Sequence, residues 1–168
     1  VKRIPVVMGQ SLAAYDPRVL KGTGVTYATS PMGADHTAGN VLPNTKLPNG
    51  EMPSLDEKEG QLELSKYLQK VAMIFDTLGL CWFSRNPILE DYSLVNDLIE
   101  AQHGVIVSFD TLLHEANISL QEENDFNNRA GLIVTNDLPE FFRNEPLPPT
   151  NKIFDIDAEV LKNLKYMD

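Results

Sequence analysis

The stretch SLDEKEGQLELSKYLQKVAMIFDTLGLC, residues 54–81, decides the fold of this chain. Its apolar residues recur at helical spacing, which predicts an amphipathic helix that stops at Gly79. Ser54 followed by Glu57 is a capping-box pattern, so we expect the helix to begin at Ser54. The stripe expected to face the core comprises Leu64, Tyr67, Leu68, Val71, Ile74, Phe75 and Leu78.

Helical patterns continue after this first helix. A second helix is expected over about 88–102, with Gly104 after it. Its inward residues are expected to be Leu94, Val95, Leu98 and Ile99. The run 105–107 either forms a short strand or precedes a helix through about 116 that Ser108 or Asp110 caps.

The two ends of the chain differ from its middle in composition and in the structure we expect. Residues 1–53 hold most of the ten glycines and several prolines, which favours irregular structure. Residues 121–150 are acidic, then rich in Asn and Pro, and are expected to wrap the surface. A short helix near 157–165 is expected to close the chain. The prediction is one mainly α, multihelical domain with an irregular segment over 1–53 and a helical part over 54–168.

Composition excludes several classes of partner. The net charge of -10 argues against nucleic acid and anionic membranes, because both need a basic face. No apolar run approaches the roughly 18 residues of a membrane helix, and no signal pattern opens the chain. The single cysteine, Cys81, excludes an internal disulfide, so a reducing cytoplasm is expected. Because the first residue is Val1, we expect a fragment of a longer chain.

The segment AYDPRVLKGTGVTYATSPMGADH, residues 14–36, combines spaced glycines, hydroxyl groups and one histidine. Gly22, Gly24 and Gly33 permit positive φ or a close approach of backbone to a ligand. The pair Gly22 and Gly24 is no dinucleotide fingerprint, since a third glycine and a preceding strand are missing. His36 ends the segment, and histidine exchanges protons near neutral pH.

The segment DTLGLC, residues 76–81, places three chemical groups at one helix end. The Asp76 carboxylate can accept paired N–H donors from a flat heterocycle. Gly79 lets the backbone turn closely against a ligand. Cys81 then points a thiolate into the same space, which suits an iron–sulfur ligand beside an organic cofactor.

Both segments resemble the aldehyde:ferredoxin oxidoreductase family. Its members carry an Asp-Pro-Arg…Lys-Gly-x-Gly…Ala-Thr-Ser…Gly-Ala-x-His run and, further on, an Asp-x-x-Gly-Leu-Cys motif. The matching residues are 16–18, 21–24, 28–30, 33–36 and 76–81, with a weaker similarity at 126–131 and 136–139. The order and separation also match, and the resemblance spans roughly residues 12–149.

The resemblance implies a specific cofactor set. Family enzymes hold tungsten, sometimes molybdenum, between two pterin dithiolenes (tungstopterin or molybdopterin), and a nearby 4Fe–4S cluster passes electrons to ferredoxin. It implies that Asp76, Gly79 and Leu80 contact a pterin and that Cys81 is a cluster ligand. It also implies that His36 lies near the metal as a proton or hydrogen-bond donor. The expected reaction oxidises a small aldehyde to a carboxylic acid.

This chain departs from the family pattern in places. Many members have Cys where this chain has Asp35, and a Leu-Arg pair where it has Thr37 and Ala38. These changes leave open a reductive use of the same cofactor on an acid or an aromatic acyl-CoA. In the family, the other three cluster cysteines and the dithiolene-binding domain lie upstream. The resemblance therefore implies N-terminal domains of the same parent chain as partners and an inactive fragment.

Each residue also has an ordinary interpretation. A lone cysteine is most often a small buried hydrophobe, and a lone histidine is most often structural or exposed. Asp16 and Arg18 form either a structural pair that fixes the glycine segment or a direct pterin contact. The alternative function is a helical, non-catalytic binding domain on this scaffold. An apolar former interface exposed by a fragment predicts self-association and hence a homo-oligomer.

Overall fold

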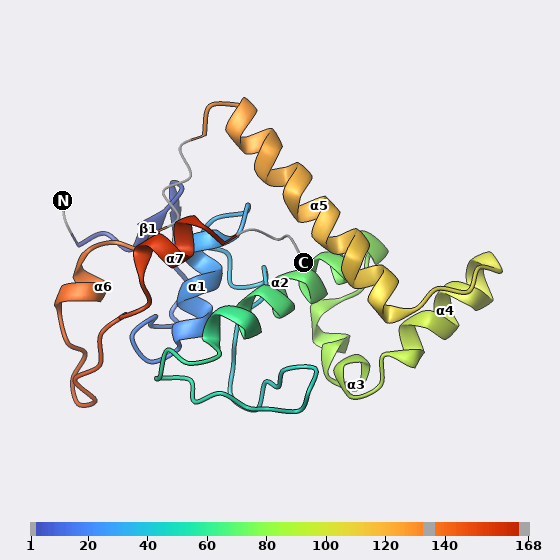
Figure 1. The fold of residues 1–168 in the computed structure, drawn as a ribbon, viewed down its shortest axis with the longest axis horizontal. Coiled ribbons are helices and arrows are strands. Elements are labelled where there is room, and N and C mark those ends of the chain that lie inside the picture. Colours follow the sequence, from blue (N-terminus) through green and yellow to red (C-terminus); the bar gives the residue numbers. More distant parts are fainter. Residues whose placement is uncertain (1–2, 133–136, 165–168) are drawn as a thin grey trace.

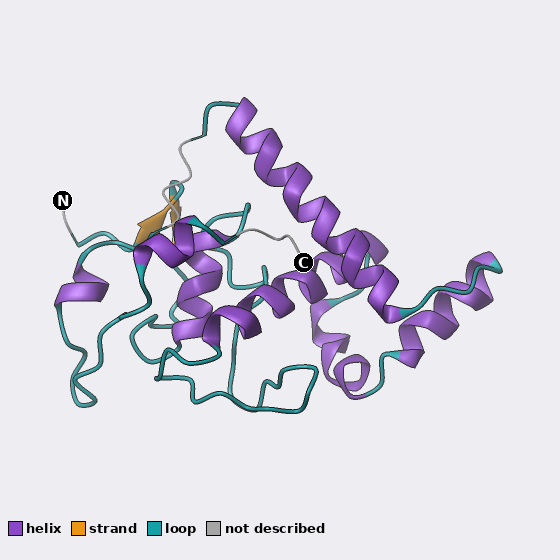
Figure 2. Ribbon diagram, viewed as in Figure 1, coloured by secondary structure: helices purple, strands orange, loops and turns teal. Residues whose placement is uncertain are grey.

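Helices are the main regular structure of the computed structural model, which describes residues 3–132 and 137–164 (Figure 2). This confirms the mainly α class. The helices in chain order are α1 (Lys21–Thr29), α2 (Gln61–Leu78), α3 (Arg85–Glu90), α4 (Ser93–His103), α5 (Phe109–Arg129), α6 (Phe141–Asn144) and α7 (Ala158–Lys162), with a 3-10 turn at Trp82–Ser84. A small antiparallel hairpin, β1 (Val6–Val7) and β2 (Gln10–Ser11), precedes them.

Helix α1 lies inside the segment for which the sequence predicts irregular structure. All nine of its residues are buried, so it has no polar face and no helical periodicity to detect. Its glycines serve packing: a Cβ on Gly22 would lie 2.5 Å from Val41 Cγ2, and one on Gly24 would lie 2.6 Å from Phe154 Cε2. The glycine spacing therefore lets α1 sit at the centre of the domain.

Helix α2 begins at Gln61, so the expected start at Ser54 is wrong. The Ser54 hydroxyl donates to Asp56 Oδ1 (2.9 Å) and does not cap the helix. The buried Gln61 side chain accepts from the Gly22 N–H (2.9 Å) and donates to the Ser54 carbonyl (2.9 Å), which fixes the start of α2 against α1. The end is as predicted, because Gly79 follows the helix with φ 65°.

The segment expected as one helix over 88–102 is two helices, α3 and α4, separated at Asp91 and Tyr92. In α4, Val95 is buried and Ile99 packs against it, whereas Leu94 and Leu98 are exposed. The inward assignment of these two leucines is therefore wrong. Within the described residues, nothing covers that face of α4, which projects from the body of the molecule (Figure 1).

Helix α5 decides between the two alternatives for residues 105–116. No strand forms at 105–107; instead Ser108 Oγ accepts from the Thr111 N–H (3.1 Å) and caps a helix. This helix runs to Arg129, so the expectation that 121–150 wraps the surface is wrong for its first nine residues. The expected closing helix is α7, which ends at Lys162; residue 165 lies outside the described residues.

The core has two main parts joined by α2, which packs against both α1 and α5 (Figure 1). One part gathers residues of α1 and of the C-terminal segment, including Val25, Phe154 and Leu161. The other gathers Phe75 of α2, Ile88 of α3 and Val95 of α4. Leu78, expected in the stripe of α2, is exposed, so the buried part of the stripe ends at Phe75.

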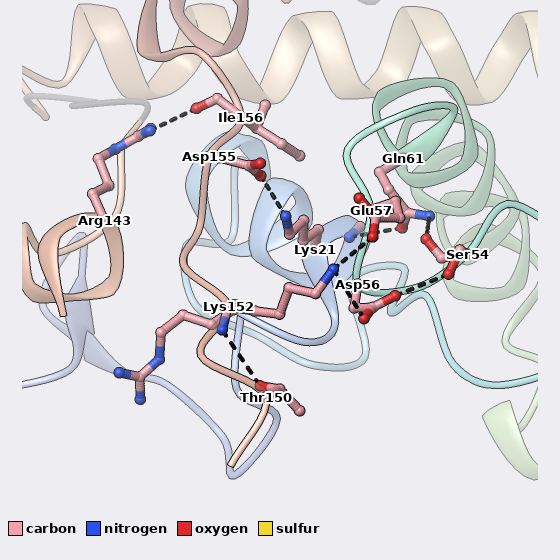
Figure 3. Close-up of polar contacts among 12 residues, drawn as sticks. Lys21, Ser54, Asp56, Glu57, Gln61, Arg143, Thr150, Lys152, Asp155 and Ile156 are labelled. Carbon is pink, nitrogen blue, oxygen red and sulfur yellow. Dashed lines mark hydrogen bonds and ion pairs between the residues drawn. The ribbon is translucent and has the colours of Figure 1, made fainter. Parts of the chain in front are cut away.

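The C-terminal segment is tied to α1 and to the loop before α2 by ion pairs (Figure 3). Lys21, only 2% exposed, donates from Nζ to Asp155 Oδ1 at 2.5 Å. Lys152 Nζ contacts Glu57 Oε1 (2.5 Å) and Asp56 Oδ2 (3.4 Å). Glu57, expected in a capping box, therefore pairs with a distant lysine instead.

Candidate functional site

The Asp76 carboxylate lies at the end of α2 without a hydrogen-bond partner among the described residues. The backbone groups there are already paired: the Gly79 N–H donates to the Asp76 carbonyl (3.2 Å), and the Leu80 N–H donates to the Phe75 carbonyl (2.8 Å). Within residues 3–132 and 137–164, the Asp76 carboxylate itself has no hydrogen bond or ion pair. Partial burial raises its pKa above the usual aspartate value, and the negative charge of Asp35 adds to the effect. The carboxylate is therefore a free acceptor for an N–H donor.

The next residues leave room beside this carboxylate. A Cβ built on Gly79 would meet no atom within 4 Å, so the surface there is open to a ligand. Leu80 packs its side chain against the core beneath α2, and its N–H is used within the helix end. The Gly79 N–H is used there as well, so the carbonyls of Gly79 and Leu80 are the main-chain groups that these two residues offer to a cofactor.

Cys81 is a free, exposed thiol. Its carbonyl accepts from the Ser84 N–H (2.9 Å) and the Ser84 hydroxyl (2.6 Å), which holds the 3-10 turn that follows. Because the backbone is fixed and the thiol reaches solvent, Cys81 can ligate a metal supplied from outside this chain. Across the described residues no group of three or more potential metal-ligating side chains occurs, so further ligands would come from elsewhere.

His36 is exposed and is held by two neighbours. Its ring stacks on Tyr15 with centroids 5.9 Å apart at 29°, and its Nδ1 lies 3.9 Å from Asp35 Oδ1. The same Asp35 oxygen accepts from the Thr37 N–H and hydroxyl, each at 2.7 Å. These contacts set the position of the imidazole while leaving it open to solvent.

The loop that carries His36 packs against α2. A Cβ on Gly39, three residues after His36, would lie 2.6 Å from the Gln69 backbone nitrogen of α2. Desolvation raises the pKa of Asp76 at the end of this helix, and the negative charge of Asp35 adds to the effect. Tyr15, which stacks on His36, also acts electrostatically on Arg85, just after the cysteine turn. Burial lowers the pKa of Arg85, and its guanidinium lies 5.2 Å from the centroid of the Trp82 ring. The sequence analysis missed Tyr15 and Arg85, although both stand within four residues of a quoted motif position.

Asp16 and Arg18 form the structural pair that was one of two alternatives for them. Arg18 donates from Nε and Nη2 to the two Asp16 oxygens (2.9 and 2.7 Å) and from Nη1 to the Glu145 carbonyl (2.8 Å). The hydrogen bond to Asp16 raises the pKa of Arg18. This bidentate pair joins the start of α1 to the segment after α6.

The structure also contains a groove that no sequence motif indicates. It has a volume of about 550 Å³ and lies between Pro31, Met32 and the second half of α5, where Glu123 and Phe126 line it. Burial raises the pKa of the Glu123 carboxyl, and the charge of Asp76 adds to the effect. Sequence reasoning missed the groove because residues almost one hundred positions apart form it.

No helix in the described part of the chain is long and apolar enough to cross a membrane.

Comparison with known proteins covers nearly the whole chain. Residues 2–166 match the family model described as aldehyde ferredoxin oxidoreductase, domains 2 and 3. The match includes the weaker similarity at 126–131 and 136–139, of which Asn136 lies outside the described residues.

Three relatives are each named tungsten-containing aldehyde ferredoxin oxidoreductase. The Pyrococcus horikoshii protein is 30% identical over 146 residues, which are 84% of this chain and 24% of that protein. The Pyrococcus furiosus and Thermococcus kodakarensis proteins are each 30% identical over 141 residues, 82% of this chain and 23% of theirs. The chain thus spans about a quarter of the length of these relatives, and it belongs to the aldehyde ferredoxin oxidoreductase family.

Proposed function

We propose that the complete gene product containing these residues is a tungsten-pterin oxidoreductase that oxidises a small aldehyde to a carboxylic acid. One observation carries the proposal: an unpaired carboxylate, an open glycine and an exposed thiol occur together at the end of α2. The names of the relatives favour tungsten over molybdenum. When bound, the metal and pterin supply two-electron redox chemistry, and a 4Fe–4S cluster carries the electrons onward singly.

The residues of this chain bind and orient those groups. Asp76 accepts N–H donors of the pterin, and Gly79 allows the ring system to approach the backbone. The packing of Leu80 into the core fixes the loop, so that the Cys81 thiol would be one ligand of the cluster, two residues after Gly79. Holding both groups at one helix end would keep the electron path between them short.

His36 handles protons in this proposal. Stacking on Tyr15 and the nearby Asp35 carboxylate orient the imidazole without closing it off from solvent. An imidazole placed in this way can exchange a proton between substrate and water near neutral pH.

Partners and location follow from the same proposal. Ferredoxin accepts the electrons, the remaining domains of the gene product complete the cofactor site, and the enzyme works in the cytoplasm as a homo-oligomer. The exposed face of α4, with Leu94 and Leu98, offers an apolar surface for such association.

Anaerobic assays of the complete gene product test the proposal. We expect oxidation of an aldehyde coupled to an artificial one-electron acceptor, and a His36→Ala variant that keeps its tungsten but loses at least tenfold in kcat. His103→Ala, the same substitution at an exposed histidine at the end of α4, is the control. Reduction of an aromatic acyl-CoA without aldehyde oxidation would support the reductive alternative. Full activity of His36→Ala at every pH would remove His36 from the mechanism.

A further inference from the structure

Arg85 differs from the other arginines of the domain in its partners. Arg3, Arg18, Arg129 and Arg143 each donate a hydrogen bond to an oxygen of another residue. Within residues 3–132 and 137–164, the Arg85 guanidinium has neither a hydrogen bond nor an ion pair. Acidic groups are not scarce, since the chain holds 24 of them against 14 lysines and arginines.

The surroundings of Arg85 make an unbalanced charge unfavourable. Burial lowers the pKa of its guanidinium, because part of the charge is removed from water. A partly desolvated cation is costly unless an anion balances it. We therefore expect the balancing anion to come from outside the described residues.

Arg85 is held one turn after Cys81. The Cys81 carbonyl accepts from the Ser84 N–H (2.9 Å), and the Trp82 carbonyl accepts from the Arg85 N–H, so the turn is continuous. Arg85 Cζ lies 5.2 Å from the centroid of the Trp82 ring. That ring in turn meets the Phe75 ring of α2 edge to face, with centroids 5.4 Å apart. These contacts hold the cation at the same end of α2 as the exposed thiol.

We propose that Arg85 raises the reduction potential of the 4Fe–4S cluster that Cys81 would ligate. A cluster bound by thiolates is an anion, and the electron that it accepts adds further negative charge. A cation one turn away from a ligand stabilises the reduced cluster more than the oxidised one, because the attraction grows with the charge. This inference rests on the proposed function and names a residue that regulates its electron transfer.

Redox titration of the anaerobically purified complete gene product, followed by the EPR signal of the reduced cluster, tests the proposal. Arg85→Gln removes the charge, so the equilibrium constant for reduction should fall about tenfold, which is about 59 mV for one electron. Arg85→Met, a second neutral variant, should shift the potential in the same direction. Arg85→Lys keeps the charge and should stay close to the wild type. Arg129→Gln removes the same charge at the exposed end of α5 and should leave the potential unchanged.

The outcomes separate this inference from the proposed function. Iron analysis of the same samples reports whether each variant retains the cluster. A lower potential in both neutral variants, with iron content and Arg85→Lys unchanged, would support the proposal. An unchanged potential in both neutral variants would overturn it and leave the cluster and the proposed function intact. A wild-type protein without a cluster would overturn both.

Discussion

Asp76 is a residue whose charge is disfavoured where it stands. Its carboxylate ends a helix at the terminus where the dipole is negative, and both desolvation and the negative charge of Asp35 raise its pKa. Nothing in the described part of the chain compensates this charge. A residue that reduces stability in this way is expected where a ligand needs it.

The raised pKa gives a prediction with a definite sign. The folded protein binds the Asp76 proton more tightly than the unfolded chain, so this residue lowers stability as pH rises above its ordinary pKa of 3.8. Asp76→Asn should therefore raise the free energy of unfolding at pH 7, and the gain should shrink as pH falls toward 3.8. Urea unfolding from pH 4 to 8 measures this, with Asp125→Asn as a solvated control. A loss of stability at pH 7 would show that Asp76 is a structural residue.

At the scale of elements, long helices with an apolar stripe were predictable and buried ones were not. The stripe of α2 and its stop at Gly79 follow from spacing and from glycine's access to positive φ. Helix α1 escaped prediction because it is buried on every side. The predicted start of α2 was wrong because the buried hydrogen bonds of Gln61 outweigh the local capping pattern of Ser54 and Glu57. A local stretch of sequence does not reveal these bonds, since one of them joins Gln61 to Gly22 in α1.

The residues of the candidate site also divide into those that the sequence predicts and those that it does not. Asp76, Gly79 and Cys81 could be proposed from the sequence because one helix end carries all three. Tyr15, Arg85 and the groove could not, since their proximity depends on how distant segments pack.

The cap of α5 provides a prediction about an element. Ser108 Oγ accepts from the Thr111 N–H, so Ser108→Ala should reduce the free energy of unfolding by about 1 kcal/mol. Chemical denaturation measures the change. Ser93→Ala makes the same substitution near the start of α4, where the hydroxyl forms no hydrogen bond with the described residues, and should have little effect. Equal losses for both variants would mean that Ser108 does not act as the cap.

At the scale of the whole molecule, the C-terminal segment is held to α1 by a buried lysine (Figure 3). Removing the partner of Lys21 leaves an ammonium group without its hydrogen bond in the core. Asp155→Ala should therefore lower the free energy of unfolding by roughly 2 kcal/mol. Glu159→Ala removes the exposed i,i+3 partner of Lys162 and should cause no measurable change. A thermally unaltered Asp155→Ala protein would contradict this account of the core.

The central claim is that the end of α2 holds a cofactor, and metal content tests it most directly. We would measure tungsten, molybdenum and iron in the anaerobically purified complete gene product and in its Cys81→Ala variant. The account predicts tungsten with about four irons per chain in the wild type, and a variant that remains folded but loses cluster iron. A well-folded wild type with neither metal, or a Cys81→Ala variant with unchanged iron, would contradict it.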